Sequence, residues 1–250
     1  MNAVLFDLDD TLFDHEQAAR AALASVHRSH STFTLWPFDT FEQAHAQALE
    51  ELHVDVLTGA RSIDDAREER FRRMFVASGA SEDVDRVRRT AAAYREAYLA
   101  ARRPVEGALA VLTTLKPRVR IAIVTNNLLD EQQAKITLCG FDSYIDALVV
   151  SEVAGVSKPH PAIFRQALEA VACQACDAVM VGDSWAADIE GARAAGIRPI
   201  WFNRSGRPSP DGSRDVREIS TLSPIDAIMH AIFDADVPSD HGAGLRCASA

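Results

Sequence analysis

Carboxylates crowd the end of a short apolar run near the start of the chain, in the segment VLFDLDDTLFD at positions 4–14. Asp7, Asp9 and Asp10 follow the run directly, and Asp14 comes shortly after them. Two carboxylates about 4 Å apart repel each other by about 4 kcal/mol at an effective dielectric constant of about 20. Such a group therefore either points into solvent or surrounds a cation.

Polar side chains also follow three later apolar segments. Thr125 and Asn126 close IVTN, Lys158 lies in GVSKPHP, and GDSWAAD contributes Asp183 and Asp188. Because the carboxyl ends of parallel strands meet at one edge of a sheet, we expect these side chains to converge with the first carboxylates. Each residue alone fits a helix cap, but the joint pattern predicts a site that holds a cation.

The elements that would position these side chains are short apolar runs without polar alternation, which is typical of parallel strands buried on both faces. The runs are AVLF (3–6), IAIVT (121–125), ALVV (147–150), AVMVG (178–182) and PIWF (199–202). Helical patterns separate them, as in HPAIFRQALEAV, where Ile163, Phe164, Ala167 and Leu168 form one stripe. We therefore expect a doubly wound, Rossmann-like α/β fold with a parallel sheet.

One long stretch interrupts this alternation. Residues 15–103 show helical spacing and no convincing strand, so we expect an α/β core at 1–14 and 104–238 with a helical insertion at 15–103. The small, polar segment 239–250 is expected to be loose. An insertion after the first strand lies over the ligand crevice of such a sheet, which suits a lid.

The bulk composition excludes some partners. A net charge of −10 repels a nucleic acid polymer on average, although a small phosphorylated ligand stays compatible with it. No apolar run approaches the length of a membrane span and no secretory signal is evident, so we expect a cytoplasmic protein without a membrane partner. Both a monomer and a small homo-oligomer are compatible with the sequence.

Four ordered motifs resemble one family. DLDDT matches the D-x-D-x-[TV] motif of the haloacid dehalogenase superfamily, and IVTNN, KPHPAIF and GDSWAAD match its second, third and fourth motifs in order and spacing. The resemblance covers about residues 1 to 235. The helical insertion resembles the type-1 cap of subfamily IA, and RFRRMF and TNNLLDEQQAK look closest to small nucleotidases and sugar phosphatases.

This resemblance implies a covalent mechanism. Asp7 would be the nucleophile that forms an aspartyl-phosphate, and Asp9 would protonate the leaving alkoxide and then activate water. Mg²⁺ would be held by the Asp7 carboxylate, the Asp9 backbone carbonyl and Asp183, with Asp188 bound directly or through water. Thr125 and the backbone N–H of Asn126 would bind phosphoryl oxygens, and Lys158 would offset charge on the phosphate and the nucleophile.

Other polar residues receive plainer interpretations. Asp10 is expected in a turn, and Asp14 is expected to cap the first lid helix. The lid also carries several arginines, of which one could reach a substrate anion while most form a solvated face. They are Arg67, Arg70, Arg72 and Arg73.

The resulting hypothesis is a Mg²⁺-dependent phosphomonoester hydrolase that acts on a nucleoside monophosphate or a sugar phosphate. A 2-haloacid dehalogenase is an alternative, but those relatives usually lack an acid at the position of Asp9. A phospho-accepting signalling module is another alternative, but it needs an open face for its partners, which a long lid disfavours. Nothing in the sequence supports a catalytically silent relative.

Overall fold

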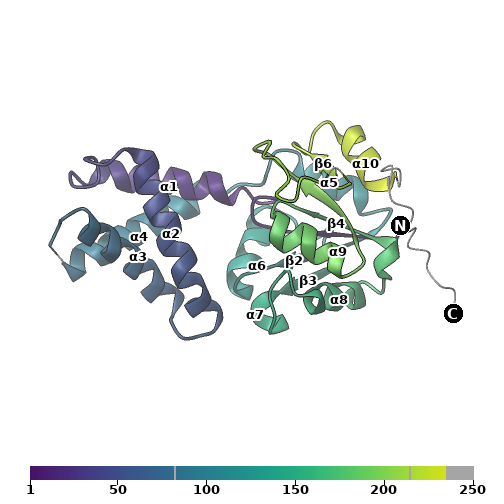
Figure 1. Cartoon of the computed structure of the whole chain (residues 1–250), viewed down its shortest axis with the longest axis horizontal. Helices are drawn as coiled ribbons and strands as arrows, with labels where there is room; N and C mark the ends of the chain where they lie inside the picture. Colours follow the sequence, from purple (N-terminus) through teal and green to yellow (C-terminus); the bar gives the residue numbers. More distant parts are fainter. Residues whose placement is uncertain (82, 214, 235–250) are drawn as a thin grey trace. The chain divides into compact units, whose positions relative to one another are not determined.

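The computed structural model describes residues 1–81, 83–213 and 215–234 and divides the chain into two compact units (Figure 1). The α/β unit comprises Met1–Asp14 and the described residues from Arg103 onward, and the helical unit comprises His15–Arg102. The segment 239–250, expected to be loose, and the last residues of the expected core, 235–238, lie outside the described residues. No described helix is both long and apolar enough to cross a membrane.

A parallel sheet forms the centre of the α/β unit, with the strand order β3-β2-β1-β4-β5-β6. The strands are β1 (Ala3–Phe6), β2 (Arg120–Thr125), β3 (Ala147–Val150), β4 (Ala178–Gly182), β5 (Arg198–Phe202) and β6 (Arg217–Ile219). The predicted doubly wound α/β fold is confirmed, and the first five strands match the five apolar runs. The strand β6 was not predicted, because its three half-exposed or exposed residues contain no apolar run.

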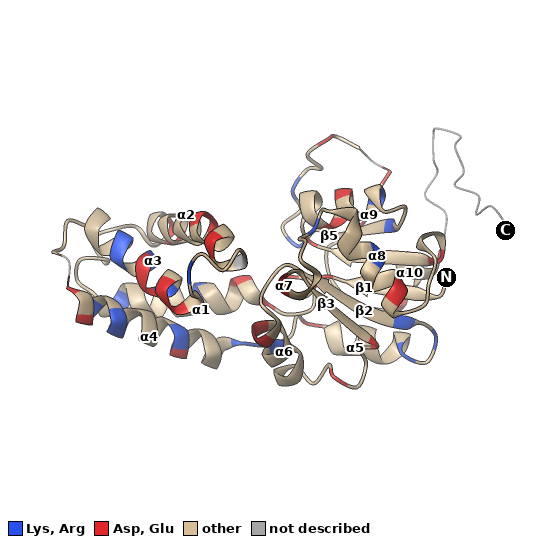
Figure 2. Cartoon of the chain, turned by 90° about the horizontal axis from the view of Figure 1, so that it is seen from below, with Lys and Arg blue, Asp and Glu red and all other residues tan. Residues whose placement is uncertain are grey.

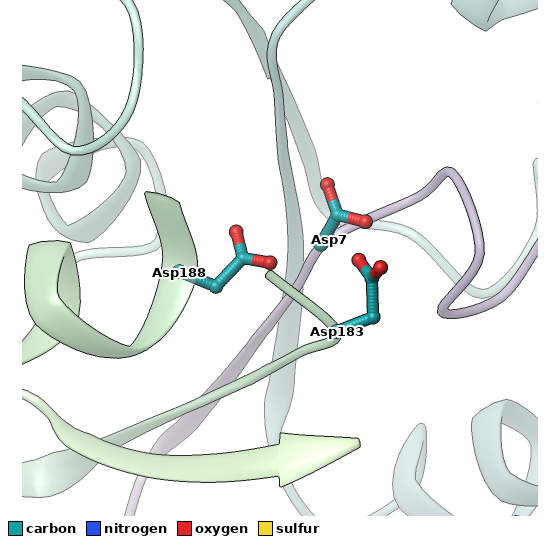
Figure 3. Close-up of side chains that lie close together, drawn as sticks. All are labelled: Asp7, Asp183 and Asp188. Carbon is teal, nitrogen blue, oxygen red and sulfur yellow. The ribbon is translucent and has the colours of Figure 1, made fainter. Parts of the chain in front are cut away.

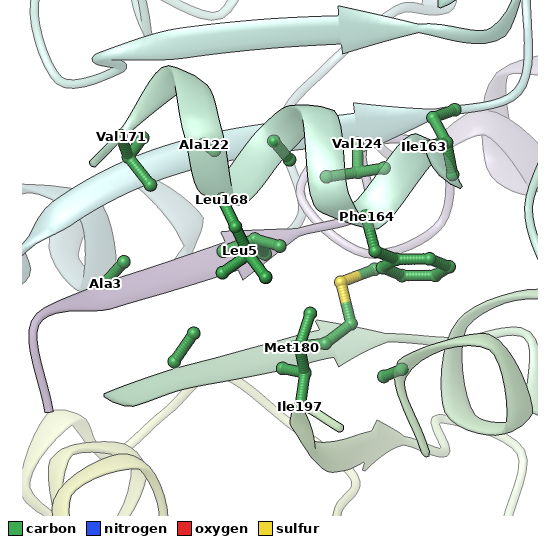
Figure 4. Close-up of a cluster of buried hydrophobic side chains, with 13 residues drawn as sticks. Ala3, Leu5, Ala122, Val124, Ile163, Phe164, Leu168, Val171, Met180 and Ile197 are labelled. Carbon is green, nitrogen blue, oxygen red and sulfur yellow. The ribbon is translucent and has the colours of Figure 1, made fainter. Parts of the chain in front are cut away.

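Helices cover this sheet, and every residue of β1 is buried between them. They are α5 (Ala108–Leu115), α6 (Leu129–Leu138), α7 (Ser151–Ala154), α8 (Pro161–Ala170), α9 (Glu190–Ala194) and α10 (Ile225–Phe233). Figure 4 shows the predicted stripe of α8 packed on the sheet, with Phe164 and Leu168 against Leu5 and Met180. This contact fixes the carboxyl ends of the central strands relative to one another.

Four helices make up the helical unit: α1 (His15–Ser29), α2 (Phe38–Leu57), α3 (Ile63–Ala77) and α4 (Val84–Ala101). Their core is aromatic, and the rings of Phe33 and Phe75 stack with centroids 4.5 Å apart. The side chain of Ser62 accepts the N–H of Asp65 at the start of α3, and Asp83 caps α4 in the same way. Acidic and basic residues are interspersed along α3 and α4 (Figure 2).

Two segments of the α/β unit lead to and from the insertion, and they pair with each other. The N–H of Val105 donates to the carbonyl of Leu12 at 2.8 Å. The carboxylate of Asp14 is buried and accepts hydrogen bonds from Arg103 at 3.0 Å and from Arg204 at 2.8 Å. Asp14 directly precedes α1, where a cap was expected, and its carboxylate also binds two distant arginines, which the sequence did not predict.

Candidate active site

Three carboxylates converge at the carboxyl ends of the central strands. Asp7 follows β1, Asp183 follows β4, and Asp188 lies in the short π-helical turn Trp185–Ile189 that comes next. One oxygen from each residue lies within 4.8 Å of the other two. Figure 3 shows the three side chains pointing toward one another from these separate segments. The parallel sheet thus brings together carboxylates from distant parts of the sequence.

The ammonium group of Lys158 lies against two of these carboxylates. Its Nζ donates to Oδ1 of Asp7 at 2.5 Å and to Oδ1 of Asp188 at 2.6 Å, and all three residues are buried. The side chain of Asn126 holds the backbone of Lys158 from both sides, since its Oδ1 accepts the Lys158 N–H at 2.7 Å and its Nδ2 donates to the Lys158 carbonyl at 2.9 Å. This role of the Asn126 side chain was missed, because the prediction concerned only its backbone N–H.

The electrostatics of the cluster favour a cation. Burial raises the pKa of Asp7 well above its usual value, and the carboxylates of Asp188 and Asp183 raise it further while Lys158 lowers it. Burial, followed by the charges of Asp188 and Asp10, raises the pKa of Asp183 to about 7. Burial lowers the pKa of Lys158, but Asp188 and Asp7 outweigh that effect and leave it above its ordinary value.

These residues fit a Mg²⁺ ion. The cluster offers three carboxylates, and one ammonium group cannot neutralise all of them when they are ionised. Hard oxygen ligands are those that Mg²⁺ prefers. The carboxylate of Asp188 is fixed by the backbone N–H of Ser184, which donates to its Oδ2 at 3.0 Å, and by close packing over Gly182. A Cβ at Gly182 would lie 2.4 Å from Cγ of Asp188, so glycine is needed at the end of β4.

The side chain of Asp9, which was expected to act as acid and base, binds residues of α6. Lys135 donates through Nζ to both carboxylate oxygens of Asp9, at 2.6 and 2.8 Å, and Gln132 donates to Oδ2 at 3.0 Å. The same Nε2 of Gln132 lies 2.6 Å from Oγ1 of Thr125 at the end of β2. Asp9 is therefore held by two α6 side chains and linked through Gln132 to Thr125.

Sequence reasoning missed both Gln132 and Lys135. They lie on the inward face of α6, where Lys135 is only 3% exposed beside the buried Ile136. A signal was present, since a glutamine and a lysine three residues apart share one helix face with an apolar residue. Asp10 lies in a turn, as expected, with a φ of 63°, and its N–H donates to the carbonyl of Phe13 at 2.7 Å.

Comparison with known proteins agrees with this fold. The family model described as haloacid dehalogenase-like hydrolase matches residues 1–196. Glyceraldehyde 3-phosphate phosphatase of Pyrococcus abyssi is 31% identical over 81% of this chain and 81% of its own length. Pyrimidine 5'-nucleotidase YjjG of Escherichia coli is 28% identical over 90% of this chain and 96% of its own.

Among solved structures, the magnesium-bound HAD hydrolase YfnB of Bacillus subtilis superposes with a TM-score of 0.70. It is 24% identical in sequence, over 91% of this chain and 98% of its own, and so supports the fold. The family match covers most of the chain, and the chain therefore belongs to the haloacid dehalogenase-like hydrolases. With phosphatases among its relatives, it stands with the phosphatases of that family.

Proposed function

We propose that the chain is a Mg²⁺-dependent phosphomonoesterase that forms an aspartyl-phosphate at Asp7. The observation that carries this proposal is the arrangement around Asp7. Its carboxylate lies within 4.8 Å of those of Asp183 and Asp188 and 2.5 Å from the ammonium of Lys158. A nucleophile placed beside both a cation site and a fixed positive charge is suited to attack on a phosphoryl group, whose transfer depends on positioning and charge neutralisation.

The carboxylates of Asp7, Asp183 and Asp188 would hold Mg²⁺, which offsets negative charge on the phosphoryl group when it is bound. Lys158 counters the charge of Asp7 and that of the incoming phosphate. Thr125 accepts a hydrogen bond from Gln132, so its own hydroxyl proton stays available for a phosphoryl oxygen.

Asp9 serves as the proton-transfer group in this proposal. It gives a proton to the leaving alkoxide and then takes one from the attacking water. Lys135 donates to both oxygens of Asp9, which is the arrangement suited to the carboxylate form that activates water. The protonated form must itself donate a hydrogen bond, so one of the Lys135 contacts is exchanged for a contact to the leaving oxygen during the first step.

The substrate proposed is a small phosphorylated metabolite, with a nucleoside monophosphate or a sugar phosphate favoured. The relatives named above support both choices, because one is named for glyceraldehyde 3-phosphate and the other for pyrimidine 5'-nucleotides. The net charge of −10 favours a small substrate over a nucleic acid polymer.

Hydrolysis of p-nitrophenyl phosphate with Mg²⁺, repeated in EDTA and followed by a panel of phosphorylated metabolites, tests the proposal. We expect activity with Mg²⁺ that is lost in EDTA. Undiminished activity in EDTA, or no activity across the panel with Mg²⁺, would contradict it. A parallel assay of halide release from 2-chloropropionate separates phosphatase from dehalogenase chemistry, and we expect no release.

A further inference from the structure

A buried arginine inside the helical unit has no anionic partner. Arg70 of α3 is only 7% exposed, and it forms no hydrogen bond or ion pair with any residue that the structure describes. Its Nε is buried and unpaired. Leaving a buried cation uncompensated is costly, and buried charges in proteins are ordinarily paired. Arg70 therefore needs an explanation beyond packing.

The other arginines of α3 have acidic partners, so the helix as a whole does not lack carboxylates. Arg72 donates to Glu69 at 2.7 Å, and Arg73 donates to Glu69 at 2.9 Å and to Glu51 at 2.6 Å. Arg67, one turn before Arg70, pairs with the exposed Asp64. These partners are on the solvated side of the helix, whereas Arg70 points into the interior.

The groups around Arg70 are aromatic or cationic. Its Cζ lies 6.0 Å from the ring centroid of Tyr94, and the His45 ring lies 5.1 Å from the same ring. His45 is 4% exposed, and its Nε2 has no hydrogen-bond partner among the described residues. Farther along α4, Tyr98 shares a 2.9 Å hydrogen bond with Nδ1 of His15.

The pKa shifts of Arg70 and His45 agree with these contacts. Burial lowers the pKa of Arg70. The nearby Tyr94 raises this pKa, and the charge of Arg67 lowers it. Burial, together with the nearby Arg70 and His15, lowers the pKa of His45 to about 3. No carboxylate is among the groups that shift either pKa.

We propose that Arg70, with His45 and Tyr94 beside it, forms a binding site for a carboxylate or phosphate anion in the helical unit. The planar guanidinium presents paired N–H donors that match the two oxygens of such an anion. The unpaired Nε2 of His45 can donate a further hydrogen bond in the appropriate tautomer. The ligand proposed is a small free anion that is held within the helical unit.

Thermal unfolding tests this site in wild-type protein, in Arg70→Met and in the matched control Arg73→Gln. Arg73 shares the helix and the charge but has acidic partners. Tm is recorded with and without sodium sulfate. We expect sulfate to raise Tm of the wild type and the control more than that of Arg70→Met. Without sulfate, Arg70→Met should be at least as stable as the wild type, because it removes an unpaired buried charge.

Arg70→Lys, which keeps the charge without the paired donors, should give an intermediate sulfate response. If sulfate raises Tm of Arg70→Met as much as Tm of the wild type and of Arg73→Gln, the site does not exist. The sulfate measurement does not depend on turnover. Failure of the proposed phosphatase function is therefore recognised separately, by the absence of p-nitrophenyl phosphate hydrolysis.

Discussion

Replacing Gly182 with alanine should disable the carboxylate cluster while leaving the fold intact. Gly182 ends β4, and its φ lies outside the left-handed region, so alanine can adopt its backbone without strain. An added Cβ would lie 2.4 Å from both Cγ and Oδ2 of Asp188. Asp188 cannot turn away freely, because its carboxylate accepts hydrogen bonds from Lys158 and from the backbone N–H of Ser184.

The size of the effect follows from this overlap. Carbon atoms pack best at about 3.5 Å, so Asp188 must move by about 1 Å to admit the methyl group. Overpacking of this kind costs about 1–3 kcal/mol of stability. A displacement of about 1 Å in a reacting site can lower catalysis about a hundredfold. We therefore expect kcat/KM to fall about a hundredfold and the Mg²⁺ concentration needed for half-maximal activity to rise.

The assay is p-nitrophenyl phosphate hydrolysis across a Mg²⁺ titration, with urea unfolding measured in parallel. Gly196→Ala is a matched control, because Gly196 has a φ of 74° and an added Cβ there would meet only Ala175, at 3.8 Å. Its left-handed backbone should cost about 1–2 kcal/mol without altering the Mg²⁺ response. If Gly182→Ala kept the kcat/KM and the Mg²⁺ dependence of the wild type, the steric overlap with Asp188 would not disturb the carboxylate cluster and the prediction would be refuted.

Three further predictions follow from the same geometry. Mg²⁺ at about a hundred times its Kd should raise the free energy of unfolding of the wild type by about 2.7 kcal/mol, measured by thermal unfolding. If Mg²⁺ stabilised Asp183→Asn by the same amount, Asp183 would not be a ligand of the ion. Lys135→Met should lower kcat about tenfold or more with little change in KM, because Lys135 positions Asp9 for general acid–base catalysis. Lys135→Arg should restore part of the lost kcat. An unaltered kcat in Lys135→Met would exclude this positioning role. The low pKa of His45, about 3, means that the unfolded chain takes up this proton below pH 6.5 while the folded chain does not. The free energy of unfolding should therefore fall as the pH decreases, by about 2 kcal/mol at pH about 5 from His45 alone. Urea unfolding of His45→Gln should show a pH dependence that lacks this loss. If His45→Gln and the wild type had the same pH dependence, His45 would not be buried in its neutral form.

Much of the α/β unit could be predicted from the sequence because its strands are buried on both faces. Burial on two sides leaves continuous apolar runs, and the ends of β1 and β4 then place Asp7 and Asp183 at one edge of the sheet. The strand β6 lacks this signal, since an edge strand with exposed residues does not need an apolar sequence. Its presence follows from its pairing with β5, which is a tertiary contact.

The missed features are polar contacts between residues far apart in the chain. Asp14 is separated from Arg204 by 190 residues, so local patterns favoured a helix cap over the ion pair that forms. Lys135 lies 126 residues from Asp9, and a buried lysine goes against the usual preference of this residue for the surface. Arg70 was one of four arginines in one segment, and only the packing of α3 distinguishes it from its neighbours.

The proposed mechanism is tested most directly by mass spectrometry of the peptide that contains Asp7, taken from protein quenched in acid during turnover of p-nitrophenyl phosphate. The account predicts one added phosphoryl group on Asp7, formed only when Mg²⁺ and substrate are both present and absent in Asp7→Asn. Substrate turnover without this adduct, or an adduct on another residue, would contradict it.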